Sequence, residues 1–363
     1  MLREIYVRPA GLYAGQHGTR ADEVWGCLRL AEGWLDFAAV EVIERNGAKI
    51  ERRIISLGDF MERDWGRRAL NAADMYECLQ TPRARVCGLP FDQPRIMGII
   101  NVTPDSFFDG SQFHNARSAI DHAKRLVDEG ADILDIGGES TRPGSQTVPI
   151  ELELKRVMPV IEGLAGKVDA LLSIDTRKAD VMRRAIGAGA DIVNDVSALT
   201  FDPDSLEVIA ETGAPVVLMH AQGDPKTMQD NPFYENVALD VFDYLEARID
   251  ACLRAGIARH KIIVDPGIGF GKTVAHNLSL LSELSLLHGL GMPVLVGASR
   301  KSFIGRLTAT NDARDRLPGS LAAACHAVSQ GAQIIRVHDV AETHQALLVW
   351  RGVHEGTLQT VEI

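Results

Sequence analysis

Residues 129–139 read EGADILDIGGE, and this stretch contains the pattern that decides the fold. Gly130 suits the left-handed residue that ends a helix, a short apolar run follows it, and polar residues come directly after the run. Similar short apolar runs occur at 95–100, 133–136, 171–174, 192–193, 216–219, 262–264, 294–296 and 334–335. Runs that are apolar throughout are typical of strands buried on both faces of a parallel sheet.

The segments between these runs carry apolar residues at helical spacing, most clearly at 116–129, 177–188, 237–255 and 320–329. Eight strands that alternate with helices are what a closed (β/α)8 barrel, the TIM barrel of the α/β class, requires. In such barrels the chemistry takes place at the carboxyl ends of the strands. We therefore expect the polar residues after the runs to face a common pocket at one rim.

The chain has 363 residues and exceeds a usual barrel of about 250 by one small domain, which lies at the front. Strands are expected at 27–31, 35–43 and 50–55, around a turn at Asn46 and Gly47, with a helix at 59–69. The sequence thus predicts a small β-rich appendage at 1–90, a barrel at 91–355 and a C-terminal tail at 356–363. A second enzyme at 1–90 is the less favoured alternative, because the segment shows no cluster of acid, base and nucleophile.

Charge and composition exclude several classes of protein. The net charge is −11 and no block of lysine and arginine stands out, which argues against nucleic acid as a partner. No apolar run of about 20 residues and no signal peptide is found, so we expect a cytoplasmic protein that does not enter a membrane. The five cysteines are odd in number and form no CxxC pair, which argues against a disulfide framework and a zinc site.

Three polar loops follow predicted strands: NVTPDSFFDG at 101–110, GGESTRPG at 137–144 and DPGIGFGKT at 265–273. The third loop looks like a phosphate-binding P-loop, but Pro266 stands where the first glycine of GxxxxGK[ST] should be. The favoured interpretation is a turn that lets Asp265 point into the pocket. Of the histidines, His220 is expected to have a packing or pocket-wall role, and His288 to be solvated.

Together with SIDT at 173–176, NDVSAL at 194–199, SRKSFIG at 299–305 and Arg336-x-His338, these loops resemble the motifs of the dihydropteroate synthases. The resemblance runs in order from residue 95 to 350. It implies a transferase that joins the pterinylmethyl group of 6-hydroxymethyl-7,8-dihydropterin pyrophosphate to 4-aminobenzoate in folate biosynthesis, giving 7,8-dihydropteroate and pyrophosphate. It further implies Mg2+ as cofactor, a homodimer and a sulfonamide target, and residues 1–90 look similar to extensions of some bacterial members.

The resemblance also implies roles for single residues. Asn101 is the expected magnesium contact. The residues expected to bind the substrates are Thr141, Asp175, Asn194, Met219, Asp265, Phe270, Lys301, Ser302, Arg336 and His338. Those expected to act in catalysis are Asp105, Arg142, Asp175 and Lys301. In this arrangement the strand-end carboxylates and amide accept from the pterin edge, while the Arg336–His338 pair holds the pyrophosphate.

Two alternatives bind a similar ligand without this reaction. A methyltransferase-like barrel that binds a folate would keep the pterin clamp but lack the residues for pyrophosphate. A non-catalytic relative would have lost Lys301, Asp175 or the Arg336–His338 pair. All of these residues are present, which favours the synthase. No strong general base is expected, because an aniline nitrogen is already nucleophilic at neutral pH.

Overall fold

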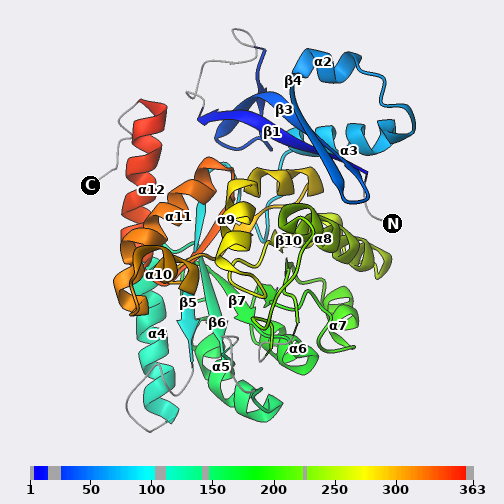
Figure 1. Cartoon of the computed structure of the whole chain (residues 1–363). Helices are drawn as coiled ribbons and strands as arrows, with labels where there is room; N and C mark the ends of the chain where they lie inside the picture. Colours follow the sequence, from blue (N-terminus) through cyan, green and yellow to red (C-terminus); the bar gives the residue numbers. More distant parts are fainter. Residues whose placement is uncertain (1–3, 15–25, 103–111, 141–146, 224–226, 357–363) are drawn as a thin grey trace.

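Eight parallel strands form a barrel in the computed structural model, which describes residues 4–14, 26–102, 112–140, 147–223 and 227–356 (Figure 1). The strands are β5 (Arg95–Asn101), β6 (Ile133–Gly137), β7 (Leu171–Asp175), β8 (Ile192–Asp195), β9 (Val216–Met219), β10 (Ile262–Asp265), β11 (Leu295–Val296) and β12 (Ile334–Val337). Neighbours pair in chain order from β5 to β10, and β12 lies between β5 and β11. A parallel bridge between Val264 and Val294 closes the ring. The predicted barrel is confirmed.

Helices cover the outside of the barrel and bury the outer face of the strands, while side chains of the strands fill the inside. The helices are α4 (Gln112–Asp128), α5 (Ile150–Leu164), α6 (Ala179–Gly187), α7 (Ser205–Thr212), α8 (Val237–Arg254), α9 (Val274–Ser282), α10 (Ser302–Thr308), α11 (Leu317–Ser329) and α12 (Val340–Glu355). Every residue of β6 and β9 is buried, which is why β9 is apolar throughout rather than alternating and why Asp135 is the one charged residue in β6.

The amino-terminal mouth of the barrel is closed by the segment that leads into β5. Val86 and Leu89 form an antiparallel bridge, and Val86 and Phe91 are buried in the innermost cluster of strand side chains. That cluster contains Met97, Ile133, Ile192, Val217, Ile263, Leu295 and Ile334. Residues 86–91 therefore pack as part of the barrel.

A separate antiparallel sheet precedes the barrel, and β3 (Leu35–Asn46) lies in its middle. It pairs with β1 (Ile5–Ala14) on one edge and with β2 (Leu28–Arg29) and β4 (Lys49–Ser56) on the other. The strands expected at 35–43 and 50–55 are confirmed, whereas the sequence pattern does not predict β1. Pro9 and Gly11 interrupt its alternation, and an edge strand tolerates the proline because no ladder donor is needed on its open side.

The helix expected at 59–69 is wrong in its bounds. α2 (Leu57–Glu62) ends early, a 3-10 turn η1 (Gly66–Arg68) follows, and α3 (Ala69–Gln80) continues the chain. The ring of Trp65 lies 5.0 Å from that of Phe60, and its indole N–H donates to the Phe60 carbonyl over 3.1 Å. This contact folds the chain back between the two helices, which local periodicity does not reveal.

The appendage packs against the outer helices and shares one hydrophobic core with the barrel; Figure 1 shows it above α9 and α11. β1 and α3 contact η4 (Leu284–Leu290), which leads from α9 toward β11. Gly289 of η4 marks a close approach, because a Cβ there would lie 2.2 Å from Cε of Met75 in α3. The ring of Tyr6 meets that of Phe242 edge-on at 5.5 Å, a contact worth about 0.5–1.5 kcal/mol beyond its buried area.

His288 shows the effect of this packing. The expectation that it is solvated is wrong, because the appendage helps to bury it; only 1% of the residue is exposed. The guanidinium of Arg83 donates to the His288 carbonyl over 3.0 Å, and the imidazole Nε2 lies 3.0 Å from the Gln330 carbonyl oxygen. Burial lowers the pKa of His288 to about 3, so the ring is neutral near pH 7.

A barrel that lacks residues 1–81 should retain turnover at saturating substrates but unfold more easily. The cut keeps Val86 and Phe91 in the barrel mouth, yet it uncovers Phe242 and the apolar face of η4. Each large apolar side chain returned to water costs about 1.5–3 kcal/mol. Thermal unfolding and steady-state assays of the truncated chain check this expectation. A folded truncation without turnover at saturating substrates would contradict it.

None of the helices in the described ranges combines the length and apolar character needed to cross a membrane. The five cysteines lie in the described ranges, and none of them is joined there by a disulfide bond.

Candidate active site

The carboxyl ends of four neighbouring strands bring buried polar and apolar side chains to one rim. Asp175, Met219 and Asp265 are the last residues of β7, β9 and β10, and Asn194 is the penultimate residue of β8. Each is 7% exposed or less, although three of the four are polar. The structure therefore brings together four of the predicted substrate-binding residues, as the strand ends suggested.

Asp135 is a central residue of this site that the sequence reasoning missed. It is fully buried in the middle of β6, where its Oδ1 accepts from the Ser173 hydroxyl over 2.6 Å. Its Oδ2 accepts from Nδ2 of Asn194 over 2.9 Å and from Nε of Arg336 over 2.6 Å. A carboxylate inside an otherwise apolar strand was the available signal, because a buried charge requires partners.

Arg336 connects Asp135 to Asp175. Its Nη2 donates to Oδ2 of Asp175 over 2.8 Å, while its Nε is bound to Asp135. Burial raises the pKa of the Asp175 carboxyl, and the guanidinium opposes that rise. Besides any contact with an anion, Arg336 therefore neutralises two buried carboxylates at the rim.

The loop after β10 is shaped around Asp265. Oδ1 of Asp265 accepts from the backbone N–H of Gly267 over 2.7 Å, and burial raises the pKa of the carboxyl. Gly267 has φ +66°, and a Cβ there would lie 1.8 Å from the His220 carbonyl oxygen. Only glycine fits this turn, which supports the interpretation of the segment as a turn that places Asp265.

Lys272 secures the same loop from inside instead of facing a phosphate. Its ammonium donates to the carbonyls of Gly267 (2.9 Å) and Phe270 (3.0 Å) and lies 2.9 Å from Nδ1 of His220. Burial lowers the pKa of Lys272 well below its usual value. His220 is 6% exposed and packs edge-on against Tyr244 at 4.8 Å, in line with the packing role expected for it.

Lys301 lies where β11 leads into α10, and its side chain contacts the loop that follows Asp265. Its ammonium donates to the Ile268 carbonyl and lies 4.7 Å from the centre of the Phe270 ring. Burial lowers the pKa of Lys301 to about 8, although the Asp265 carboxylate favours the charged form. The amine can therefore change charge close to neutral pH.

Pterin affinity should fall by up to about tenfold as the pH rises through 8, because a hydrogen bond from a charged donor contributes about 1.5–3 kcal/mol and a neutral one less. The lowered pKa gives the sign: Lys301 donates as an ammonium below pH 8 and becomes neutral above it. Calorimetry with a pterin between pH 6.5 and 9.5 measures the profile. Lys301→Arg keeps its charge and should remove the step, and the same step in both proteins would assign it to another group.

His338 and Ser302 occupy the other side of the rim. His338 follows β12, and its Nδ1 lies 3.1 Å from the Ser299 hydroxyl, which also accepts from the His338 backbone N–H over 3.3 Å. Ser302 is the first residue of α10 and is exposed. The preceding Arg300 is ion-paired with Asp339, which ties the loop after β11 to the loop after β12.

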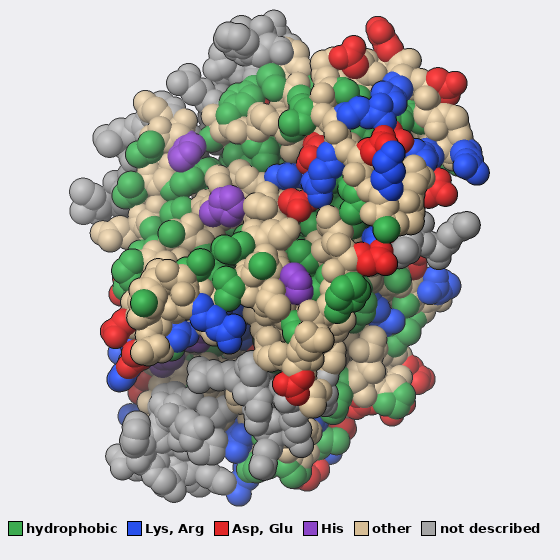
Figure 2. All heavy atoms as spheres, in the orientation of Figure 1, with side chains coloured by type: hydrophobic (Ala, Val, Ile, Leu, Met, Phe, Trp, Pro, Cys, Tyr) green, Lys and Arg blue, Asp and Glu red, His purple; other side chains and the backbone are tan. Residues whose placement is uncertain are grey.

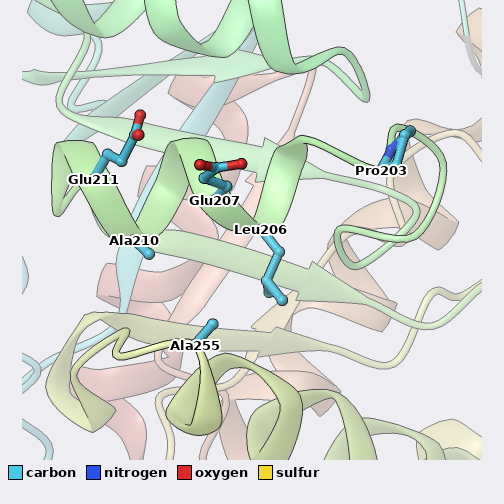
Figure 3. Close-up of a pocket in the computed structure, with 6 residues that line it drawn as sticks. All are labelled: Pro203, Leu206, Glu207, Ala210, Glu211 and Ala255. Atoms are coloured by element: carbon cyan, nitrogen blue, oxygen red, sulfur yellow. The ribbon is translucent and has the colours of Figure 1, made fainter.

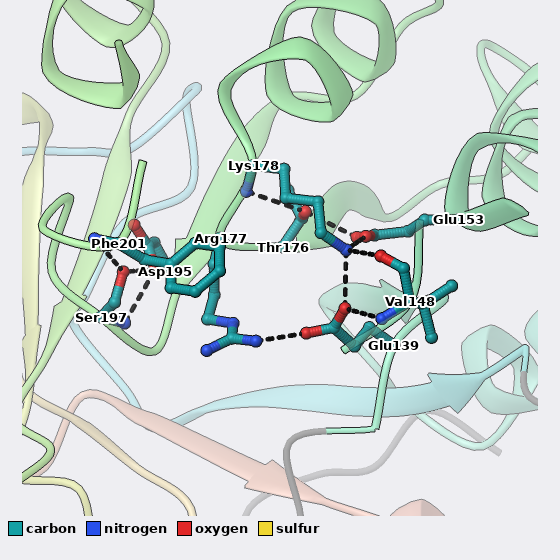
Figure 4. Close-up of polar contacts among 9 residues, drawn as sticks. All are labelled: Glu139, Val148, Glu153, Thr176, Arg177, Lys178, Asp195, Ser197 and Phe201. Atoms are coloured by element: carbon teal, nitrogen blue, oxygen red, sulfur yellow. Dashed lines mark hydrogen bonds and ion pairs between the residues drawn. The ribbon is translucent and has the colours of Figure 1, made fainter. Parts of the chain in front are cut away.

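A buried ionic cluster joins Glu139, just after β6, to the turn after β7 (Figure 4). The Glu139 carboxylate accepts from Arg177 (2.5 Å), from Lys178 (2.6 Å) and from the backbone N–H of Val148 (2.8 Å). Lys178 also meets the Glu153 carboxylate. Burial would raise the pKa of Glu139, but the bonds from Lys178, Val148 and Arg177 hold it below its usual value. Glu139 within the GGESTRPG motif and Val148 beyond it are thus both bound to the turn after Asp175.

Four of the residues singled out in the sequence, Asp105, Thr141, Arg142 and the neighbouring Pro143, lie outside the described residues. Asn101 ends β5 at the same rim. In the described ranges no three His, Cys, Asp or Glu side chains are grouped as a metal site. A single amide oxygen still fits Mg2+, which commonly takes its other ligands from substrate phosphates and water.

A hollow of about 520 Å³ lies outside the barrel wall (Figure 3). Leu206 and Ala210 of α7 point toward Ala255 at the end of α8, and Glu207 and Glu211 lie at its edge. It contains none of the strand-end residues described above, so the rim remains the candidate site.

Comparisons with known proteins agree with this geometry. A family model described as pterin binding enzyme matches residues 97–338. The dihydropteroate synthase of Escherichia coli K12 is 49% identical over 266 residues, 73% of this chain and 94% of its own length. That of Haemophilus influenzae is 47% identical over 264 residues, 73% of this chain and 95% of its own.

Solved structures give the same result. Xanthomonas albilineans dihydropteroate synthase with 4-aminobenzoic acid superposes with a TM-score of 0.70 at 49% identity, covering 75% of this chain and 98% of its own. The same enzyme with 7,8-dihydropteroate gives a TM-score of 0.68 at 46% identity, covering 75% and 98%. The barrel and its rim of buried polar residues thus define a pterin-binding enzyme. The chain belongs to the dihydropteroate synthase family.

Proposed function

We propose that this enzyme is a transferase that joins 6-hydroxymethyl-7,8-dihydropterin pyrophosphate to 4-aminobenzoate. The C–O bond between the pterin methylene and the pyrophosphate breaks, and the pyrophosphate leaves with the electron pair. The aniline nitrogen forms a new C–N bond to the methylene carbon and then releases a proton to water. The products are 7,8-dihydropteroate and pyrophosphate.

The observation that carries this proposal is the presence of three buried hydrogen-bond acceptors and the cation Lys301 at the same rim. Asp175, Asn194 and Asp265 present oxygens to the amine and N–H groups of a pterin edge, and Lys301 donates to its carbonyl. Because these groups are buried, a ring without the matching pattern would leave them unpaired, at about 1–3 kcal/mol for each group. Met219 and Phe270 supply the apolar walls.

The leaving group is assigned to the neighbouring part of the rim, at the end of β12. We assign His338 and Arg336 to the pyrophosphate, since barrel enzymes frequently bind phosphate beside the seventh and eighth strands. Asn101 would contact the Mg2+ ion, which supplies charge neutralisation for the departing pyrophosphate when it is bound. Thr141 and Ser302 are assigned to the second half of the site, where 4-aminobenzoate binds. Arg142 is assigned to the pyrophosphate, and Asp105 keeps its catalytic assignment.

The experiment that tests the function is an assay of pyrophosphate release from the full-length protein. Release should require the pterin pyrophosphate, 4-aminobenzoate and Mg2+ together, and 7,8-dihydropteroate should appear in equal amount. Release without 4-aminobenzoate would indicate a hydrolase. Pterin binding without any release would favour the non-catalytic alternative.

We propose a homodimer formed through α12. Val349 and Val353 lie one helical turn apart on this helix and are 62% and 72% exposed. Replacing both with Lys should convert the dimer to a monomer, because an interface core tolerates charge poorly. Light-scattering mass measures this, and Leu70→Lys, at a position 79% exposed on α3, is the matched control. An unchanged mass for the double variant would exclude this face.

The proposed compartment is the cytoplasm, since five cysteines without a disulfide among them fit a reducing environment. A complex of the Yersinia pestis enzyme with a sulfonamide drug is among the similar structures. We therefore propose that sulfonamides compete with 4-aminobenzoate here, which a competition assay in the presence of the pterin pyrophosphate tests.

A further inference from the structure

Arg45 joins the appendage to the barrel through carboxylates at the start of α8. It lies near the end of β3, and its side chain is only 4% exposed. Its Nη2 meets the carboxylates of Glu235 (3.0 Å) and Asp240 (2.9 Å), and its Nη1 lies 3.5 Å from that of Asp243. Tyr6 of β1 also donates its hydroxyl to Asp243 over 2.9 Å. Two side chains of the appendage thus bind one acidic cluster at the start of α8.

The acidic cluster fixes residues 235 and 236, which lead into α8. Oδ2 of Asp240 accepts from the backbone N–H groups of Glu235 (3.0 Å) and Asn236 (3.2 Å), while Oδ1 meets Arg45. The amide oxygen of Asn236 accepts in turn from the N–H of Leu239 over 3.1 Å and caps the helix. A guanidinium that holds Asp240 therefore also holds residues 235 and 236.

Tyr234 extends this connection to the loop after β10. Its hydroxyl donates to the carbonyl of Gly271 over 2.8 Å, and its ring lies 6.0 Å from the Lys272 ammonium. Lys272 is bonded to the carbonyl of Gly267, in the turn whose N–H holds Asp265. Ion pairs, hydrogen bonds and short stretches of backbone thus connect Arg45 of the appendage to Asp265.

We propose that the appendage braces the pterin pocket, with Arg45 as a positioning residue that acts through Asp240 and Tyr234 on the turn presenting Asp265. This inference rests on the pterin-binding role proposed for Asp265. The appendage lies outside residues 97–338, so the family match assigns it no role. A site that is already ordered before its ligand arrives binds more tightly, because less ordering remains to be done on binding.

The test is Arg45→Met, which keeps most of the side-chain length and removes the charge. The Kd for a pterin and the KM for the pterin pyrophosphate should rise about tenfold, whereas kcat at saturating substrates should stay within about twofold. Arg45→Lys should recover part of the affinity, because an ammonium lacks the planar fork that meets several carboxylates. The control is Arg53→Met on β4, whose guanidinium pairs with Glu44 inside the appendage over 2.6 Å, and it should change neither constant.

Tyr234→Phe removes only the hydroxyl contact with Gly271 and should also raise the Kd for a pterin. This variant therefore tests the proposal even if Arg45→Met does not fold. A folded Arg45→Met variant with a lower unfolding midpoint but an unchanged pterin Kd would show that Arg45 only attaches the appendage. An unchanged Kd for Tyr234→Phe would likewise overturn the proposal. If the wild-type protein released no pyrophosphate, the proposed reaction would fail, but calorimetry with a pterin would still decide whether the brace exists.

Discussion

Arg336→Met should lower the free energy of unfolding by about 3–5 kcal/mol, the usual loss when one partner of a buried ion pair is removed. The guanidinium binds Asp135 over 2.6 Å and Asp175 over 2.8 Å. Without it, two carboxylates remain buried beside each other with no cation between them. Chemical denaturation followed by circular dichroism measures the loss.

The pH dependence of this loss has a definite sign. Burial already raises the pKa of Asp175, and removing Arg336 should raise it further. An acid whose pKa is higher in the folded than in the unfolded state favours folding as the pH falls, so the deficit should be smaller at pH 5 than at pH 8. Adding Asp135→Asn should recover part of the stability. A variant as stable as the wild type would show that the two ion pairs do not form.

His338→Ala is the matched contrast to Arg336→Met. It leaves Asp135 and Asp175 paired, so we expect it to weaken the pterin pyrophosphate far more than a pterin without pyrophosphate. Calorimetry with both ligands distinguishes the two variants. Equal weakening of both ligands by His338→Ala would show that His338 supports the ring or the fold instead.

Asp265→Ala should weaken pterin binding by about 2–5 kcal/mol, the range for truncating one partner of a buried charged hydrogen bond. The substitution removes the acceptor for the donor edge of the pterin. It also removes the bond that Oδ1 accepts from Gly267, which shapes the turn. Calorimetry with a pterin at pH 7 measures the change in affinity.

Asp265→Asn separates these two effects. Its amide oxygen can keep the bond from the Gly267 N–H, so the turn should remain, while the charge opposite Lys301 is lost. We expect an affinity between those of Asp265→Ala and the wild type. Wild-type affinity for Asp265→Ala would remove Asp265 from the pterin site.

Several parts of the site follow from the sequence because strand position determines where a residue lies. A carboxylate directly after a mainly apolar run, such as Asp175 or Asp265, must stand at the carboxyl rim once that run is a barrel strand. The role of Gly267 can also be predicted from the sequence, since a turn this tight needs a residue without a side chain. The predicted barrel and the group of Asp175, Asn194 and Asp265 depend only on such local patterns.

Other parts of the site can be recognised only in the folded structure. Asp135 lies inside an apolar run, and its partners Ser173, Asn194 and Arg336 come from three other strands, so no sequence spacing relates them. Lys272 ends a loop that resembles a phosphate-binding motif, yet it turns inward to carbonyls and to His220. Closure of the barrel decides which residues come close enough to pair with a buried charge.

The appendage shows the same division between sequence and tertiary structure. The segments 35–43 and 50–55 on either side of the turn at Asn46 and Gly47 were sufficient to predict two strands, because such a turn between two strand-like segments is typical of a hairpin. Neither the burial of His288 nor the contact of Arg45 with Asp240 could be inferred, because both depend on where the appendage docks on the barrel. The sequence by itself determined which segments become strands and helices through local periodicity. Only the tertiary structure decided which distant residues neutralise one another, because burial of a charge is favourable only when folding brings its partner within reach.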